Sequence, residues 1–162
     1  MNASMHIFHM LLLSLFFVLM SGAASPAIFI NEVSTIEIAA TEMPIIETEA
    51  LDGTFHWKRI PIPAADTAEM HALTAFEHFF RYGSYGIPHN VKVLNVSLAN
   101  GLLTVDVSAD ILSYGGSAFE RALAEQLIKI AAEIPSAEKF TLTTDGVLRP
   151  LIYGTEINRI QL

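Results

Sequence analysis

Few residues of this 162-residue chain stand where they could do chemistry, and the first to consider are two acids, Asp106 and Asp110. General acid–base catalysis needs two carboxylates that converge in one pocket. Asp106 falls on the polar face of a predicted strand, whereas Asp110 follows the end of that strand. The two side chains are therefore not expected to converge, and we assign no catalytic residue.

Serine and histidine residues offer a second candidate site. A catalytic triad could be assembled from Ser113, Ser117 and His89 by residue type alone, but no nucleophile elbow or dinucleotide fingerprint accompanies them. His71 and His78 share a predicted helix face, and two helical turns separate them by roughly 10 Å. Bonds of about 2 Å to one metal ion cannot bridge that separation. We interpret both as partly exposed helix histidines and predict no metal ion and no cofactor.

The composition excludes further classes. The chain has no cysteine, which rules out disulfides, thiol catalysis, cysteine-based metal sites and a lipidated N-terminal cysteine. The net charge is −8, but from Gly53 onward eleven acidic residues face nine basic ones, so this part is nearly neutral. No basic patch supports binding to nucleic acid.

The remaining candidates are surfaces. One face of a predicted sheet is small and polar, and it is either plain solvent-facing surface or a flat docking or self-association surface; its residues are Asn95, Ser97, Thr104, Asp106, Thr141 and Thr143. Tyr82 and Tyr85 lie in a glycine-punctuated loop, where they contact a partner or cover the edge of the core. His56 and Trp57 suggest either a binding site or an aromatic strand that packs under a helix.

The element that positions the polar face is a β-hairpin over Val91–Ser108, closed by the two-residue turn Asn100-Gly101. Centring that turn predicts an apolar face made of the cross-strand pairs Leu98–Leu103, Val96–Val105 and Leu94–Val107. On the other face, Ser97 is expected to meet Thr104 and Asn95 to meet Asp106. A sheet with one apolar side requires a second layer.

Two amphipathic helices supply that layer. The first begins near Ala68, where Asp66 can cap it. It carries an apolar stripe, with Leu73 beside it; the stripe consists of Ala72, Ala75, Phe76, Phe79 and Phe80. The second covers about Ala118–Ile134, after a Ser117/Glu120 capping box. Its predicted apolar stripe consists of Phe119, Ala122, Leu123, Leu127, Ile130 and Ile134.

Strands complete the pattern: one at Thr54–Pro61, one at Glu138–Thr144, and a short edge strand at Val147–Leu151. The resulting order, β-α-β-β-α-β, predicts an α+β fold. We expect a two-layer sandwich with both helices on one face of a small mixed or antiparallel sheet.

Residues 1–52 precede this domain. The apolar run Ile7–Met20 and the small residues after it indicate that residues 1–24 are a signal peptide or an uncleaved membrane anchor. Residues 25–52 read as an acidic linker, because Asn31–Asp52 holds six acids and no Lys or Arg, and Pro44 argues against regular structure. This linker is a solvated spacer or an acidic docking segment, and the folded domain is residues 53–162.

Three stretches and a late glycine carry a family resemblance: ALTAFEHFF at 72–80, IPHNVKVLNVSLANGLLTVDVSADI at 87–111, GSAFERALAEQLIKIAAEIPSAEKFTLTTDG at 116–146, and Gly154. In their order and spacing they resemble the GerMN family, also called the sporulation and spore germination domain. The resemblance implies an extracytoplasmic, non-catalytic module of the bacterial envelope. Many relatives are lipoproteins, whereas this chain has Ala23 or Ala24 at the lipobox position, and it has room for one copy of a domain that some relatives carry in tandem.

The expected function is an exported interaction or scaffold domain of the cell envelope, linked to sporulation or germination and not an enzyme. The expected partners are envelope or sporulation-complex proteins, or a second copy of the chain, with membrane contact only through the N-terminal segment. The alternative is a small binding module for cell-wall glycan or a peptide.

Overall fold

The computed structural model describes residues 38–83 and 85–162, which belong to the compact unit Thr35–Leu162. The predicted signal peptide or anchor at 1–24 lies outside the described residues. The described elements, in chain order, are β1 (Thr41–Glu49), β2 (Phe55–Ile62), α2 (Ala68–Tyr82), β3 (Val93–Ala99), β4 (Leu102–Val107), the short 3-10 helix η1 (Ala109–Leu112), α3 (Ser117–Ala132), β5 (Lys139–Thr144) and β6 (Ile160–Gln161). Among these residues no helix is both long and apolar enough to span a membrane.

The central hairpin forms as predicted. Asn100 and Gly101 take φ values of 51° and 74°, the left-handed region that a two-residue turn of this kind requires. Leu98 pairs with Leu103 and Val96 with Val105, as the sequence predicts. The pairing of Leu94 with Val107 is wrong, because a bulge between Val93 and Asn95 shifts the register and places Val93 opposite Val107. Leu94 is therefore 50% exposed.

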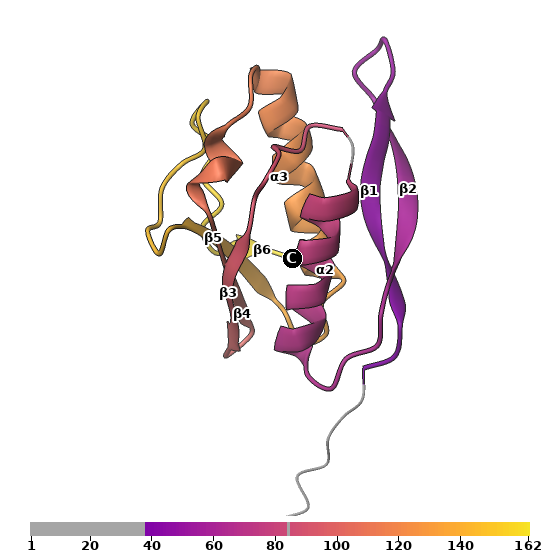
Figure 1. Ribbon diagram of the computed structural model, residues 1–162, viewed down its shortest axis with the longest axis vertical. Helices are drawn as coiled ribbons and strands as arrows, with labels where there is room; N and C mark the ends of the chain where they lie inside the picture. Colours follow the sequence, from indigo (N-terminus) through magenta and orange to yellow (C-terminus); the bar gives the residue numbers. More distant parts are fainter. Residues whose placement is uncertain (1–37, 84) are drawn as a thin grey trace, which may run out of the picture. The chain divides into compact units, whose positions relative to one another are not determined.

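The main sheet has the strand order β3-β4-β5-β6. β4 and β5 run parallel, and α3 makes the crossover between them, while the other two pairs are antiparallel. Both helices lie on one side of this mixed sheet (Figure 1), and Phe76 of α2 stacks on Phe140 of β5 with ring centroids 5.7 Å apart. The predicted α+β class is confirmed.

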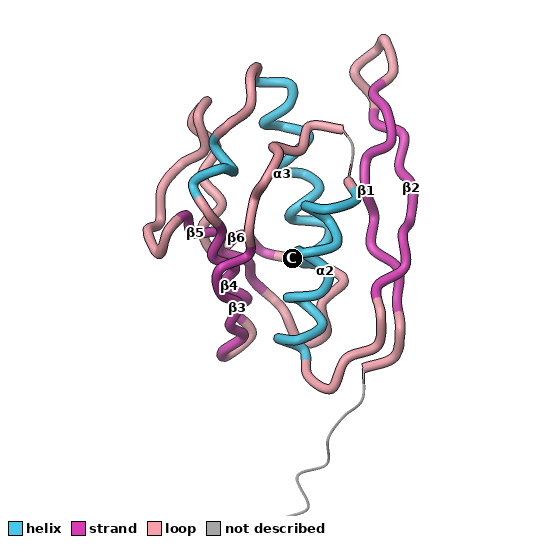
Figure 2. The backbone as a smooth tube through the Cα atoms, in the orientation of Figure 1, coloured by secondary structure: helices cyan, strands magenta, loops and turns pink. Residues whose placement is uncertain are grey.

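Two predicted strands behave differently from expectation. Val147–Leu151 forms no edge strand; only an isolated bridge links Val147 to Thr144, and Ile160–Gln161 pairs with β5 instead. The strand predicted at Thr54–Pro61 exists as β2, but it pairs with β1 in a separate two-stranded sheet. In Figures 1 and 2 this hairpin lies along the helices on the side away from the main sheet.

The prediction that residues 41–49 belong to an acidic linker is wrong, because they form β1. Met43 and Ile46 are 0% exposed, whereas Glu42 and Glu47 face solvent. The acidic residues that indicated a spacer are thus the solvent-facing positions of a strand. Pro44 is tolerated since a strand of a two-stranded sheet has one side without a ladder partner, where a missing N–H costs nothing.

Helix α2 buries its predicted stripe, with Ala72, Ala75, Phe76 and Phe79 fully enclosed. Its cap is Thr67 and not Asp66, because the Thr67 hydroxyl accepts a bond from the Met70 N–H at 3.1 Å. His71 is 0% exposed, so its assignment as a partly exposed histidine is wrong; its Nε2 lies 3.0 Å from the Thr41 hydroxyl of β1. Burial lowers the pKa of His71. His78 is half-buried, as expected.

Helix α3 is buried on more than one side, because the main sheet packs on one face and β1 on another. Of its predicted stripe only Phe119 differs, being 41% exposed. The Ser117/Glu120 capping box is absent: the N-cap is Gly116, and the Glu120 carboxylate binds the C-terminal loop instead.

One buried amide joins the hairpin to this helix. Gln126, 0% exposed, accepts a bond from the Ile46 N–H at 2.6 Å. Its side-chain NH₂ donates to the Tyr85 carbonyl at 3.0 Å and to the Ala122 carbonyl at 3.2 Å. Gln126 therefore ties β1, α3 and the loop after α2 together at one point.

Replacing Gln126 with leucine should leave the Ile46 N–H and the Tyr85 carbonyl buried without partners. We expect Gln126→Leu to lower the free energy of unfolding by about 1–3 kcal/mol, measured by urea denaturation. The same change at the exposed Gln161 of β6 is the control, and its effect should stay within about 0.5 kcal/mol. Equal effects of the two substitutions would contradict the proposed role of Gln126 in joining β1, α3 and the loop after α2.

Candidate interaction site

The polar face of the main sheet is only partly available to a partner. Asp106 Oδ1 accepts bonds from the Thr143 hydroxyl at 2.7 Å and from the Gly146 N–H at 2.8 Å, so it fixes the turn after β5. Thr141 is 7% exposed, and its hydroxyl accepts a bond from the Arg159 N–H at 2.9 Å. The C-terminal segment therefore covers this end of the predicted surface.

Three of the predicted surface residues remain open. Asn95 and Ser97 on β3 are exposed, and Thr104 on β4 is half-buried opposite Ser97. All three lie on the two strands at one side of the sheet. The exposed part of the predicted surface therefore lies on β3 and on the neighbouring part of β4.

The residues considered for catalysis are engaged elsewhere. The Asp110 carboxylate accepts a bond from the Ser108 hydroxyl at 2.8 Å, whereas the Asp106 carboxylate accepts one from the Thr143 hydroxyl. The two carboxylates therefore make separate local contacts. His89 and Ser113 line one hollow of about 240 Å³, but the Ser113 hydroxyl donates to the Asp110 carbonyl at 2.6 Å. A hydroxyl committed to a carbonyl in this way is not activated by a base. Within residues 38–83 and 85–162, no three metal-ligating side chains gather.

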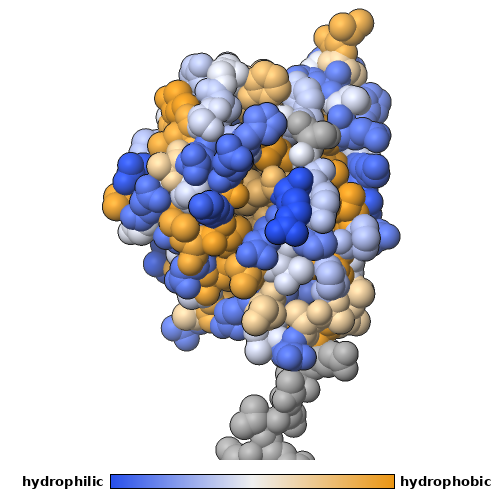
Figure 3. Space-filling view, viewed as in Figure 1, coloured by the Kyte–Doolittle hydropathy of each residue, from blue (hydrophilic) through white to orange (hydrophobic). Residues whose placement is uncertain are grey.

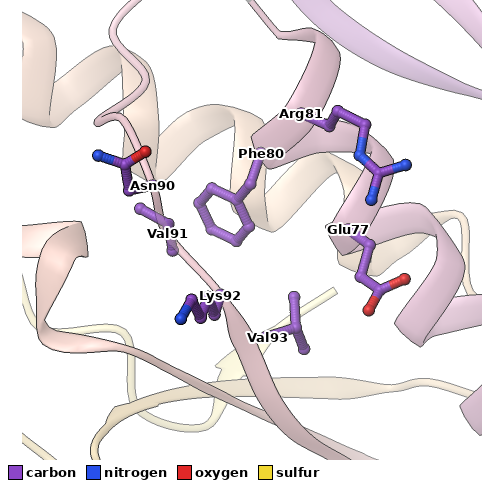
Figure 4. Close-up of a pocket in the computed structure, with 7 residues that line it drawn as sticks. All are labelled: Glu77, Phe80, Arg81, Asn90, Val91, Lys92 and Val93. Atoms are coloured by element: carbon purple, nitrogen blue, oxygen red, sulfur yellow. The ribbon is translucent and has the colours of Figure 1, made fainter.

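A larger hollow lies between the C-terminal half of α2 and the chain that enters β3. It measures about 490 Å³ and is lined by Glu77, Phe80, Arg81, Asn90, Val91, Lys92 and Val93. Figure 4 shows the Phe80 ring pointing from the helix toward Val91, with Arg81 and Lys92 from opposite walls. We call this hollow the β3 groove.

The β3 groove adjoins the open edge of the main sheet, because β3 is the outermost strand. The two-residue turn makes Ala99 and Leu102 exchange backbone bonds, and alternate residues repeat the pattern. Val96 and Leu98 fall between these pairs, so their N–H and C=O groups point away from β4. Among the described residues, no loop or turn backbone bonds to them.

The groove is amphipathic. Phe80, Val91 and Val93 are half-buried and pack against the core, whereas Arg81, Lys92 and Glu77 are exposed. Figure 3 shows apolar surface over β3 beside strongly hydrophilic side chains at the adjoining end of α2. A groove with an apolar floor, two cations and one acid at an unpaired strand edge is suited to an extended, amphipathic segment.

Sequence reasoning missed this groove. The positions of Glu77, Phe80 and Arg81 on one helix face were readable from their spacing. That β3 and not β4 is the edge follows only from the parallel pairing of β4 with β5. The sequence carried no local signal for that choice.

Tyr82 and Tyr85 separate in the structure. Tyr82 is 58% exposed at the end of α2, beside His78. The Tyr85 hydroxyl donates to Glu49 of β1, and its ring contacts Phe55 and Phe119 at centroid distances of 6.2 and 5.5 Å. Hydrogen bonding to Glu49 raises the pKa of Tyr85. Tyr85 thus lies with Phe55 and Trp57 of β2, and Tyr82 does not.

A buried carboxylate organises the C-terminal loop. Glu120 is 1% exposed and accepts bonds from the Tyr114 hydroxyl at 2.5 Å, the Tyr153 N–H at 2.6 Å and the Thr155 N–H at 2.9 Å. Burial alone would raise the pKa of Glu120, but these donors outweigh it and lower that pKa below its usual value. Burial and the same bond raise the pKa of Tyr114.

Comparisons with known proteins identify the class of domain. The family model Germane, described as sporulation and spore germination, matches residues 57–149. Among solved structures, the first GerMN domain of the sporulation protein GerM from Bacillus subtilis is 18% identical, with a TM-score of 0.53 over 75% of this chain and 96% of that one.

A second structure, the tandem GerMN domains of the same Bacillus subtilis protein, is 16% identical with a TM-score of 0.53 over 76% of this chain. The alignment spans 46% of that longer chain. At these identities the likeness shows the fold alone. A comparison with functionally curated proteins gives no match.

The Glu120 network predicts a pH-dependent stability. Because its pKa is lower in the folded than in the unfolded chain, the Glu120 carboxylate stabilises the fold above the unfolded pKa of about 4.5, and this stabilisation is lost as pH falls through the folded pKa. Glu120→Gln should lower the free energy of unfolding by about 2–3 kcal/mol at pH 7. The measurement is urea denaturation from pH 7 downward.

The control is Glu125→Gln on the same helix, which should change the free energy of unfolding by less than about 0.5 kcal/mol. The gap between the Glu120→Gln variant and the parent chain should narrow below about pH 5. A gap that stays constant down to pH 3 would show that the charge of Glu120 contributes nothing.

Proposed function

This chain belongs to the Germane family of sporulation and spore germination domains, and from that premise we propose that it is a non-catalytic interaction domain that works outside the cytoplasm, in the bacterial cell envelope. The partner in this proposal is an envelope or sporulation-complex protein, or a second copy of the chain. The domain is exported, then secreted or held by its uncleaved N-terminal segment.

The observation that carries the proposal is the open edge of β3 beside the β3 groove. Backbone groups at such an edge bond to an incoming strand, and a neighbouring groove reads its side chains. The groove offers an apolar floor at Phe80 and Val91 and cations at Arg81 and Lys92. An extended partner segment with alternating apolar and acidic residues fits both features.

Two further observations support a binding role over catalysis. The residues with catalytic potential are tied to backbone or to turns, as Asp106 and Ser113 are. The apolar run at Ile7–Met20, followed by small residues, is typical of exported chains. An extracytoplasmic interaction domain accounts for both.

Site-specific photocrosslinking in the cells that make the protein tests this proposal. A photoreactive residue at Lys92, in the groove, should yield a discrete crosslinked species containing one envelope protein or a second copy of this chain. The same residue at the exposed Glu156, in the C-terminal loop, is the matched control and should yield none.

Reversing a charge in the β3 groove distinguishes a specific contact there from crosslinking by random collision. Arg81→Glu combined with a crosslinker at Asn90 should reduce the crosslinked species at least about fivefold, because the groove loses a cation. Lys58→Glu on the exposed hairpin should leave it unchanged. Crosslinking that is equal at Lys92 and Glu156, or indifferent to Arg81→Glu, would overturn the proposed function.

A further inference from the structure

Four aromatic side chains contact one another in succession along the seam between the β1–β2 hairpin and α3. Their ring centroids are 6.4 Å apart from Trp57 to Phe55, 6.2 Å from Phe55 to Tyr85 and 5.5 Å from Tyr85 to Phe119. Trp57 and Phe55 are two residues apart on β2, so both side chains leave the same face of the strand. We call these four residues the aromatic row.

Two cations from α3 show that the row follows the helix axis. Lys129 Nζ lies 4.7 Å from the Trp57 ring centroid, and the Arg121 guanidinium carbon lies 5.0 Å from that of Phe55. Lys129 and Arg121 are about 12 Å apart along the helix, at 1.5 Å rise per residue. The row therefore extends along α3 from Trp57, near the end of the helix, to Phe119 in its first turn.

The aromatic row is not part of the hydrophobic core. None of its members belongs to the buried core cluster or to the half-buried apolar side chains that pack against it. Trp57 is 36% exposed and Phe119 41% exposed. Large aromatic side chains that leave the core and gather on a surface mark a binding site, since burying them inside would contribute more to stability.

Hollows lie at both ends of the row. Beside Trp57 a hollow of about 440 Å³ is lined by Pro44, Trp57, Arg59, Lys129, Ala132 and Glu133. At the other end, Phe119 forms a wall of the 240 Å³ hollow that also contains His89 and Tyr114. A row of rings that joins two hollows is suited to a chain-like ligand.

The two arginines beside the row are each paired with a carboxylate, whereas Lys129 lies over the Trp57 ring. Arg59 donates to Glu133 at 3.1 Å beside Trp57, and Arg121 donates to Glu49 at 3.0 Å beside Phe55. A polyanion would meet carboxylates as well as cations, so nucleic acid does not fit. A proline-rich segment offers acceptors only, so it could bond to the arginine of each pair but not to the carboxylate. Hydroxyl groups, which donate and accept, match both members of each pair.

We propose that the aromatic row binds a neutral, hydroxyl-rich polysaccharide whose sugar rings stack on Trp57, Phe55, Tyr85 and Phe119. The apolar C–H faces of pyranose rings lie flat on aromatic rings, and the hydroxyl and acetamido groups bond to the Arg–Glu pairs at the side. This site is separate from the β3 groove, so the domain can hold a glycan strand and a protein partner together.

The single tryptophan of the chain provides the readout, because Trp57 is a member of the row. The experiment titrates the full chain, in detergent micelles, with the hexasaccharide of N-acetylglucosamine and follows Trp57 fluorescence. Binding should shift the emission saturably. Phe119→Ala, at the far end of the row, should weaken the apparent affinity about fivefold while leaving the reporter in place.

Tyr82→Ala, which removes an exposed aromatic ring outside the row, is the matched control and should leave the affinity unchanged. Phe119→Leu keeps the bulk of the side chain without the aromatic face, so it separates the loss of the ring from misfolding caused by the smaller alanine. It should weaken binding as well. The proposal is overturned by an absent shift, by equal affinities for the parent chain and both Phe119 variants, or by a shift with a proline decapeptide and none with the sugar.

Discussion

The structure depends on the burial of α3 on two sides. Its apolar residues cover more of the helix than one sheet can enclose, because Ala124 and Ala131 are buried together with Leu123, Leu127 and Ile130. The β1–β2 hairpin supplies the second cover. Gln126, in the middle of the helix, accepts the Ile46 N–H and so fixes where β1 lies. Without that cover the helix would expose apolar surface to solvent.

The two candidate binding surfaces follow from this arrangement. Since the crossover through α3 places β5 beside β4, β3 is left at the edge of the main sheet, and the C-terminal half of α2 forms a groove beside it. Since the hairpin packs along α3, the side chains of Phe55 and Trp57 meet Arg121 and Lys129 along the seam. One surface is a strand edge and the other a row of rings, so they suit different ligands.

Much of this fold was readable from local sequence signals. The Asn100-Gly101 turn fixed the hairpin, and the three- and four-residue apolar spacing located both helices. The wrong predictions share one physical reason: the same local pattern can serve two structural roles, and residues far away in the sequence decide which one it takes. Glu120 could have capped α3, but the N–H groups of Tyr153 and Thr155 claim its carboxylate. The acids of residues 41–49 suggested a spacer, but the apolar residues between them cover α3.

The candidate site was less predictable than the fold. Three residues of the expected polar face remain open, Asn95, Ser97 and Thr104, whereas Thr141 is covered by a segment 18 residues further along the chain. The grouping of Trp57 with Tyr85 and Phe119 brings together a strand, a loop and a helix. No spacing in the sequence relates them, and only packing does.

Hydrogen exchange of the full chain, followed by mass spectrometry, tests the central claim that the β3 edge receives a partner. The comparison is between the purified chain and the chain in isolated envelopes of the cells that make it. The account predicts fast exchange of the Val96 and Leu98 N–H groups, which point away from β4, in the free chain. Both should exchange slowly once the partner is bound, with β1 and β2 unchanged. Slow exchange of these two groups in the free chain, or no protection of them in the envelope, would contradict the account.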